Sequence, residues 1–339
     1  MLGLLILLTG ITLNACAPTS DVLEAQVIPP SPVAQTATPT PPPRPTLAPP
    51  LVSVSGEETA VPAATLTTEM MVGETAVPPT VIPVIVPPAF LLPTPSGANI
   101  WTLRVPILMY HYLSVPPADA DIYRTDLSVT PENFRQQMAY LAENGYTPID
   151  FYQLSAAITA QTDLPDKPIL LTFDDGYLDN YENAFPILQE FGFTATFFII
   201  TDLADQGAPG YANWEQLKEM AAAGMRIESH TKNHPDLSTM GRDGVIFQVL
   251  GSQETIAAHI GYTPRYLCYP GGRYNAETMQ ILSELGLWGA VTTQGGAWHS
   301  FADRYEWDRQ RMRYDTTLEQ FARLIDPENT VGGKVVTEN

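Results

Sequence analysis

The pattern of apolar and polar positions changes at Trp101, and from there on short apolar runs alternate with amphipathic stretches. Continuous apolar runs bounded by turn residues are typical of strands that are buried on both faces. The sequence predicts such strands in RVPILMYHYL (104–113), KPILLTFDDG (167–176), TATFFII (194–200), MRIESH (225–230), RYLCYP (265–270) and WGAVTT (288–293).

The amphipathic stretches between these runs predict helices. In TPENFRQQMAYLAENGY (130–146), Thr130 is a helix cap, Pro131 suits the first helical position and Gly145 ends the helix. Further helices are expected in NAFPILQEFGF (183–193), NWEQLKEMAAAG (213–224), VIFQVLGSQETIAAHIG (245–261), NAETMQILSELG (275–286) and TLEQFARLI (317–325). This alternation favours parallel βαβ units, in an α/β barrel or a doubly wound sheet, over residues 101–326.

The first hundred residues have a different composition, with nineteen of the 32 prolines of the chain. A Pro- and Thr-rich segment cannot build a packed core, so residues 17–100 are expected to form a long disordered tether. The apolar stretch VIPVIVPPAFLLP (81–93) is broken by prolines and is not expected to span a membrane. Residues 327–339 are expected to be a flexible tail.

The opening MLGLLILLTGITLNAC resembles a bacterial lipoprotein signal peptide over residues 1–16, because a short apolar run ends in a small residue and Cys16. The resemblance implies lipid attachment at Cys16 and export, either to the outer face of the bacterial cell membrane or by secretion. An ordinary signal peptide and an uncleaved anchor are the alternatives. Cys268 then has no disulfide partner in the chain and is expected to be a buried thiol.

The charge of the chain restricts its partners. A formal net charge of −20 argues against nucleic acid and against anionic membrane surfaces as partners. It also disfavours a polyanionic substrate, unless a local basic patch exists.

Polar side chains follow several of the predicted strands where each strand ends: His111, Asp174 and Asp175, His230 and His234, and the Pro270-Gly271-Gly272 turn. In parallel α/β folds, active sites gather at these ends. Taken singly, Asp-Asp-Gly can be a simple turn, and a lone histidine is more often structural. Together, two histidines and a carboxylate match zinc and similar ions.

These residues carry a resemblance to the polysaccharide deacetylases of the NodB-homology type, carbohydrate esterase family 4. TFDDG (172–176), HTKNH (230–234) and RYLCYPGG (265–272) are similar to three motifs of that family. The resemblance covers about residues 104–326, with the core motifs within 167–326, and implies a distorted (β/α) barrel.

The resemblance also implies roles for individual residues. Asp175, His230 and His234 look like ligands of one divalent metal ion, zinc before cobalt or nickel. Asp174 looks like the general base. The same resemblance suggests that Arg265 orients the base and that the Gly271 N–H stabilises an oxyanion.

The general acid is less directly indicated. The strand VPILMYHYL (105–113) resembles that of a subgroup that includes poly-N-acetylglucosamine deacetylases, and this resemblance implies His111 as the acid. His299 in GGAWHS is the alternative. His259 lies within a predicted helix and is read as structural.

The chain departs from the family pattern in two places. Gly271-Gly272 stands where the family has Tyr-Gly, and the fourth motif is not clearly matched. YEWDRQRMRYD (305–315) is the candidate for it, with Arg311 or Arg313 supporting the site. Tyr269, Trp298 and Trp307 are candidates for stacking on sugar rings, and the alternative for each tryptophan is ordinary packing.

The sequence therefore predicts a metal-dependent hydrolase that removes N-acetyl groups from N-acetylhexosamine units of a polysaccharide, such as peptidoglycan, poly-N-acetylglucosamine or chitin-like oligomers. Two alternatives stay open: an O-acetyl esterase acting on xylan or peptidoglycan, and a non-catalytic glycan-binding lipoprotein. The long tether suggests a monomer anchored to a membrane by lipid.

Overall fold

The computed structural model describes residues 101–159 and 162–326. The predicted signal peptide with Cys16, the tether and the tail lie outside the described residues. Within the described ranges, no helix is both long enough and apolar enough to cross a membrane.

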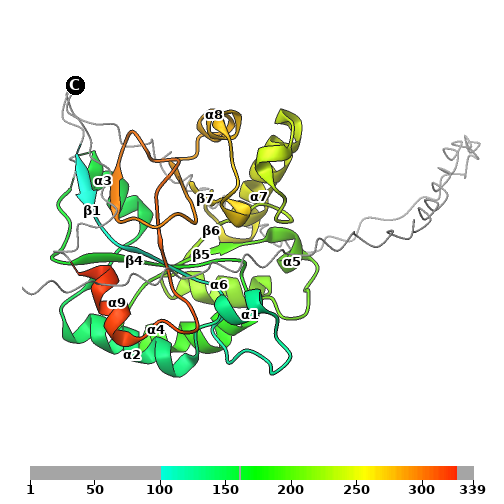
Figure 1. The fold of residues 1–339 in the computed structure, drawn as a ribbon. Coiled ribbons are helices and arrows are strands. Elements are labelled where there is room, and N and C mark those ends of the chain that lie inside the picture. The colour runs from blue at the N-terminus through cyan, green and yellow to red at the C-terminus, as the bar shows by residue number, and fades with distance from the viewer. Residues whose placement is uncertain (1–100, 160–161, 327–339) are drawn as a thin grey trace, which may run out of the picture. The chain divides into compact units, whose positions relative to one another are not determined.

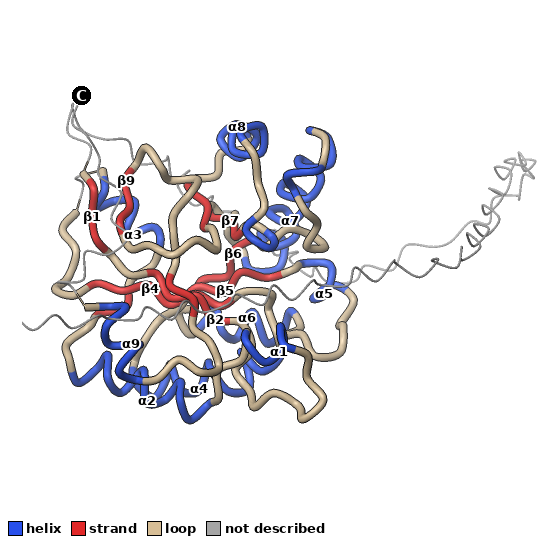
Figure 2. The backbone as a smooth tube through the Cα atoms, in the orientation of Figure 1, coloured by secondary structure: helices blue, strands red, loops and turns tan. Residues whose placement is uncertain are grey.

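A curled parallel sheet forms the centre of the fold, as Figure 2 shows. Its strands lie in the order β10 (Gln310–Arg311), β2 (Ile107–Tyr110), β4 (Pro168–Phe173), β5 (Thr196–Ile199), β6 (Arg226–Ser229), β7 (Tyr266–Cys268) and β8 (Gly289–Val291), and β3 (Thr147–Pro148) pairs with β4. Each neighbouring pair is parallel.

The segment 307–311 connects the two ends of this sheet. Trp307 forms a parallel bridge with Val291 of β8, and three residues later β10 pairs with β2. The expected distorted (β/α) barrel is therefore confirmed, with short strands where it closes.

Helices cover the outside of the sheet (Figure 1), where α2 packs against α4 and α9, and α7 packs against α6 and α8. They are α2 (Pro131–Glu143), α4 (Phe185–Phe191), α6 (Trp214–Ala222), α7 (Arg242–Ile260), α8 (Ala276–Glu284) and α9 (Leu318–Ile325). Each falls within a predicted helix or overlaps it closely. Thr130 caps α2 by accepting a hydrogen bond from the Asn133 N–H, and Pro131 is the first helical residue, as the sequence predicts.

The strands have two buried faces because the sheet has a core on each side. Ile107, Leu170, Tyr266 and Trp307 belong to the core inside the curl, where α3 (Phe151–Ile158) also packs. In β2, β4 and β7, the residue that follows each of the first three belongs to a core outside the curl, against the helices. Side chains that alternate between two apolar environments produce the continuous apolar runs seen in the sequence.

Several short elements are additions to the predicted set. They are α1 (Ile122–Asp126), α5 (Thr201–Asp205), the π-helical turn η1 (Asn180–Ala184), and the 3₁₀ turns η2 (Leu237–Thr239) and η3 (Pro270–Gly272). A separate antiparallel pair joins β1 (Thr102–Arg104) to β9 (Trp298–Ser300). Because β1 leads into the start of β2, this pair lies toward the end of the barrel opposite to His111.

Candidate active site

Alternation along the strands turns a set of polar side chains toward one end of the barrel interior. Leu170 of β4 lies in the inner core, so Asp174, four residues on, faces the same way. By the same alternation, His111, His230 and Cys268 face inward at the ends of β2, β6 and β7. Arg309 faces inward from the closing segment 307–311, two residues after Trp307 of the inner core. The convergence expected from the sequence is thus produced by strand geometry.

Three side chains fit a metal ion. Asp175, His230 and His234 each offer one ligand atom, and these atoms lie within 4.8 Å of one another. The Nε2 atoms of His230 and His234 lie 3.2 and 3.5 Å from Asp175 Oδ1. That oxygen is buried without a well-aligned hydrogen bond. Two imidazole nitrogens and a buried oxygen that converge in this way suit a tetrahedral ion with an open position.

The backbone at this cluster is held in an unusual conformation. Asp175, Thr231 and His234 have φ angles of 73°, 68° and 60°, in the left-handed region that costs about 1–3 kcal/mol for residues other than glycine. Gln248 of α7 holds the loop between the two histidines, because its Oε1 accepts hydrogen bonds from the N–H groups of Lys232 and Asn233. The surrounding fold therefore imposes the geometry of the ligands.

Hydrogen bonding fixes which atoms face the site. The Nδ1 atom of His230 lies 2.7 Å from the carbonyl oxygen of Cys268, so Nδ1 donates and Nε2 keeps its lone pair for an ion. Burial acts to raise the pKa of Asp175, but the close approach of His230 outweighs burial and lowers the pKa to about 2. Asp175 is therefore an ionised ligand near neutral pH.

Arg309 is the partner of the candidate base. Its Nη1 and Nη2 atoms donate to Asp174 Oδ1 and Oδ2 at 2.8 and 2.7 Å, and both side chains are almost fully buried. Burial acts to raise the pKa of Asp174, but the Arg309 guanidinium outweighs burial and holds the pKa well below its usual range. Sequence reasoning missed Arg309, although it lies inside the stretch proposed as the fourth motif.

The prediction that Arg265 orients the base is wrong. Its guanidinium donates to the carbonyl oxygen of Gly286, and its main-chain N–H donates to Glu228. Arg265 precedes Cys268 by three residues, so strand alternation places its side chain on the opposite face, away from the interior. Arg311 and Arg313 also do not reach the base, because both pair with Asp126 in α1.

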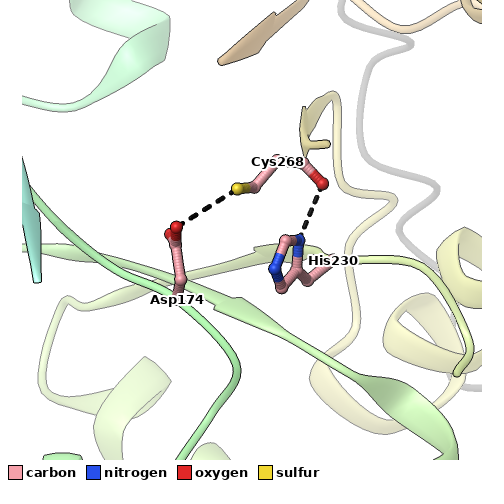
Figure 3. Close-up of side chains that lie close together, drawn as sticks. All are labelled: Asp174, His230 and Cys268. Carbon is pink, nitrogen blue, oxygen red and sulfur yellow. Dashed lines mark hydrogen bonds between the residues drawn. The ribbon is translucent and has the colours of Figure 1, made fainter. Parts of the chain in front are cut away.

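Cys268 is buried, as expected, and it contacts the base directly. Its Sγ lies 3.3 Å from Asp174 Oδ2, and Figure 3 shows the thiol pointing at this carboxylate. Burial raises the pKa of the thiol, so it stays protonated. Asp174, His230 and Cys268 also lie close enough together for a metal. The Arg309 Nη2 atom already sits 3.2 Å from Sγ, and its positive charge opposes a cation there.

His111 lies beside the base and His299 does not. The Nε2 atom of His111 is 3.7 Å from Asp174 Oδ2, while Nδ1 is buried without a partner. Burial lowers the pKa of His111, although Asp174 and Asp175 oppose this effect. His299 is fully buried on β9, and its Nε2 bonds to the carbonyl oxygen of Val105 near the other end of the barrel. The alternative that His299 is the acid is therefore wrong.

His259 fits the structural role expected for it. It lies in α7, and its ring stacks on Trp214 at a centroid distance of 4.1 Å.

The candidate sugar contacts do not lie at the site. Tyr269 and Trp307 are 0% and 1% exposed and pack in the cores, so neither side chain can stack on a sugar. Trp298 lies on β9 beside Arg104, away from the catalytic end. Gly271 does lie at the end of β7, with a φ of 58° that suits glycine, and its role in stabilising an oxyanion stays a prediction.

Comparisons with known proteins agree with this site. A family model described as polysaccharide deacetylase matches residues 161–290. YxkH of Bacillus subtilis (strain 168), which is named as a polysaccharide deacetylase, is 33% identical over 223 residues, covering 66% of this chain and 76% of that protein. The solved structure of Streptococcus pyogenes deacetylase PplD in complex with acetate has a TM-score of 0.62 at 30% identity, covering 67% of this chain and 100% of that one.

A third relative shares a shorter region. Poly-β-1,6-N-acetyl-D-glucosamine N-deacetylase of Escherichia coli (strain K12) is 35% identical over 121 residues, which are 32% of this chain and 18% of that protein. The match to YxkH over most of its length confirms the resemblance seen in the motifs. This chain, a hydrolase of the deacetylase type, belongs to the polysaccharide deacetylase family.

Proposed function

We propose that this protein removes N-acetyl groups from N-acetylhexosamine units of an extracellular or cell-wall polysaccharide. The observation that carries the proposal is the convergence of two ionised aspartates and three histidines at one end of the barrel in a member of this family. Support for an amide substrate comes from relatives named as poly-β-1,6-N-acetyl-D-glucosamine N-deacetylases in Escherichia coli and Staphylococcus aureus. Peptidoglycan and chitin-like oligomers carry the same acetamide group.

The ligands Asp175, His230 and His234 would hold one divalent ion, and their nitrogen-rich chemistry favours zinc. Such an ion would supply Lewis-acid polarisation of the acetyl carbonyl and would make water at the site more acidic.

The residues of the chain account for the proton transfers. Asp174 accepts a proton from the water that attacks the acetyl carbonyl carbon, and Arg309 holds both carboxylate oxygens in place for this step. His111, 3.7 Å from the base, donates a proton to the departing nitrogen. The C–N bond then breaks, and acetate and a free amine are released.

The test is acetate release from N-acetylglucosamine oligomers by the full chain, first chelated and then resupplied with zinc. We expect zinc-dependent release that is abolished in Asp174→Asn. Release from acetylated xylan but not from any N-acetyl glycan would replace this proposal with an O-acetyl esterase. Glycan binding with bound zinc and no acetate release from either substrate would instead indicate a non-catalytic glycan-binding protein.

We also propose that the protein is exported and anchored by lipid at Cys16, since the first sixteen residues resemble a lipoprotein signal. In a bacterial host, a labelled fatty acid should be incorporated into the wild-type chain and not into Cys16→Ser. Incorporation into both chains would contradict the anchor.

A further inference from the structure

The π-helical turn η1 begins four residues after the end of the TFDDG motif and contacts the strand end that carries His111. Asn180 Nδ2 donates to the carbonyl oxygen of His111 at 2.7 Å, and Asn183 Nδ2 donates to that of Leu113 at 2.8 Å. Two amides of one turn thus bind two carbonyls of one segment. π-Helical turns often occur at functional sites.

The ring of His111 is weakly held by comparison. Its Nδ1 atom is buried without a partner, and its Nε2 atom is 3.7 Å from Asp174 Oδ2, beyond hydrogen-bond distance. His111 also lies one residue past the end of β2, so its carbonyl is outside the strand ladder. The position of this main chain therefore sets the position of the ring.

Folding stability alone does not explain why an asparagine side chain is buried at position 180. It is 1% exposed, and its Oδ1 atom is buried without a partner. A half-satisfied buried amide costs about 1–3 kcal/mol relative to a fully bonded one. Its Nδ2 donates to His111 and more weakly, at 3.1 Å, to Asp179 of the same turn.

We propose that Asn180 is a positioning residue, which holds the His111 main chain so that the imidazole can protonate the leaving nitrogen. This inference rests on the proposed function, because it assigns His111 as the acid. A displacement of about 1 Å in a catalytic group can lower a rate by two orders of magnitude. Asn180 thus acts on the reaction through His111, without contact to the substrate.

The test uses two substrates that differ in their need for an acid. An N-acetylglucosamine oligomer needs protonation of its departing amine, whereas an activated aryl acetate releases a phenolate that leaves without a proton. Asn180→Leu and Asn180→Ala are each compared with His111→Ala and with the wild type, all as full chains loaded with zinc. Zinc content and the thermal midpoint are measured for each variant.

Asn183→Leu is the matched control. It removes an amide-to-carbonyl hydrogen bond of similar length from the same turn, but from Leu113 rather than from His111. It therefore reports any general loosening of the segment.

We expect the Asn180 variants to lower kcat/KM on the oligomer by about 10- to 100-fold and to change it on the aryl acetate by less than about threefold. His111→Ala should show the same selectivity more strongly, and Asn183→Leu should show none. Equal losses on both substrates, no loss on either, or the same selectivity in Asn183→Leu would overturn the inference.

The outcomes also distinguish a failure of the role proposed for Asn180 from a failure of the proposed function, in which His111 is the acid. If His111→Ala lowers both rates equally, the assignment of the acid fails and the role of Asn180 fails with it. If His111→Ala is selective and neither Asn180 variant is, only the inference about Asn180 is wrong.

Discussion

At the residue scale, the adjacent carboxylates of Asp174 and Asp175 lie in different surroundings. Asp174 continues the inward alternation of β4 and meets Arg309, whereas the left-handed backbone at Asp175 turns the next carboxylate toward His230. Carboxylates buried side by side would raise each other's pKa. A guanidinium beside one and imidazoles beside the other keep both ionised, so one is available as a base and the other as a ligand.

Replacing Arg309 by Met tests this arrangement. The change leaves Asp174 buried without its partner, so we expect the free energy of unfolding to fall by about 3–5 kcal/mol and kcat/KM to fall by about 100-fold or more. Urea denaturation and acetate release measure the two effects. Arg265→Met is the control and should leave kcat/KM within about threefold of wild type, because its guanidinium donates a hydrogen bond to the carbonyl oxygen of Gly286, away from the base. A comparable loss of activity in Arg265→Met would contradict the assignment.

At the scale of elements, the closing segment 307–311 links structure to chemistry. Trp307 stacks on Phe151 of α3 at 6.0 Å and donates from Nε1 to the carbonyl oxygen of Ser300 at 3.1 Å. Two residues later, the same alternation brings Arg309 to the base. Packing of the indole inside the barrel therefore helps to fix the position of the guanidinium.

We expect Trp307→Ala to destabilise the protein by about 3–5 kcal/mol, as is usual for truncation of a buried aromatic side chain. KM for an oligomer should stay near the wild-type value, because the indole has no exposed face. Chemical denaturation and steady-state kinetics measure these quantities. A tenfold rise in KM corresponds to a loss of about 1.4 kcal/mol of binding free energy. Such a rise without a change in stability would instead show that Trp307 contacts the sugar.

At the scale of the whole molecule, an ion bound at the three ligands should stabilise the fold. Zinc at about one hundred times its dissociation constant adds about 2.7 kcal/mol to the free energy of unfolding, so the thermal midpoint of the chelated protein should rise on zinc addition. Asp175→Ala should lose this rise. Asp163→Ala, at an exposed aspartate, should keep it. An equal rise in Asp175→Ala would place the zinc elsewhere.

The free energy of unfolding of the whole fold depends on pH through Glu228. Burial raises the pKa of this carboxyl to about 8, although it accepts hydrogen bonds from Tyr152 and from two main-chain N–H groups. Between the usual pKa of about 4.5 and about 8, the folded protein binds a proton that the unfolded chain has released. Stability contributed by this group is therefore full below the lower value and is lost as pH rises through the upper one.

We expect Glu228→Gln to gain stability relative to the wild type as pH rises from about 5 to 8, with a slope of up to about 1.4 kcal/mol per pH unit. Glutamine can keep the same contacts if its carbonyl accepts the two N–H groups and its amide faces Tyr152. Urea titrations of both proteins at several pH values measure the difference. A difference that does not vary with pH would show that Glu228 is ionised throughout.

The sequence by itself was sufficient for features that depend on local pattern. Apolar runs located the strands, and caps such as Thr130 located helix ends, because strand alternation and helix capping act over a few residues. The two short motifs brought Asp174, Asp175, His230 and His234 to attention, because they resemble family motifs and because parallel strands end at one edge of a sheet. The structure brings these side chains together, while their roles in catalysis stay proposals.

Tertiary structure alone decided which distant side chains meet. In the stretch RQRMR, Arg309, Arg311 and Arg313 share one strand face, so alternation does not distinguish them, and the sequence analysis named Arg311 or Arg313 instead of Arg309. Only the way in which this segment closes the barrel brings Arg309 to Asp174 and leaves the other two arginines at the rim with Asp126. The burial of Trp307 and the distance of His299 from the site were likewise decided by tertiary structure. Alternation along a strand determines which face a residue occupies, but the packing of distant segments determines what that face contacts.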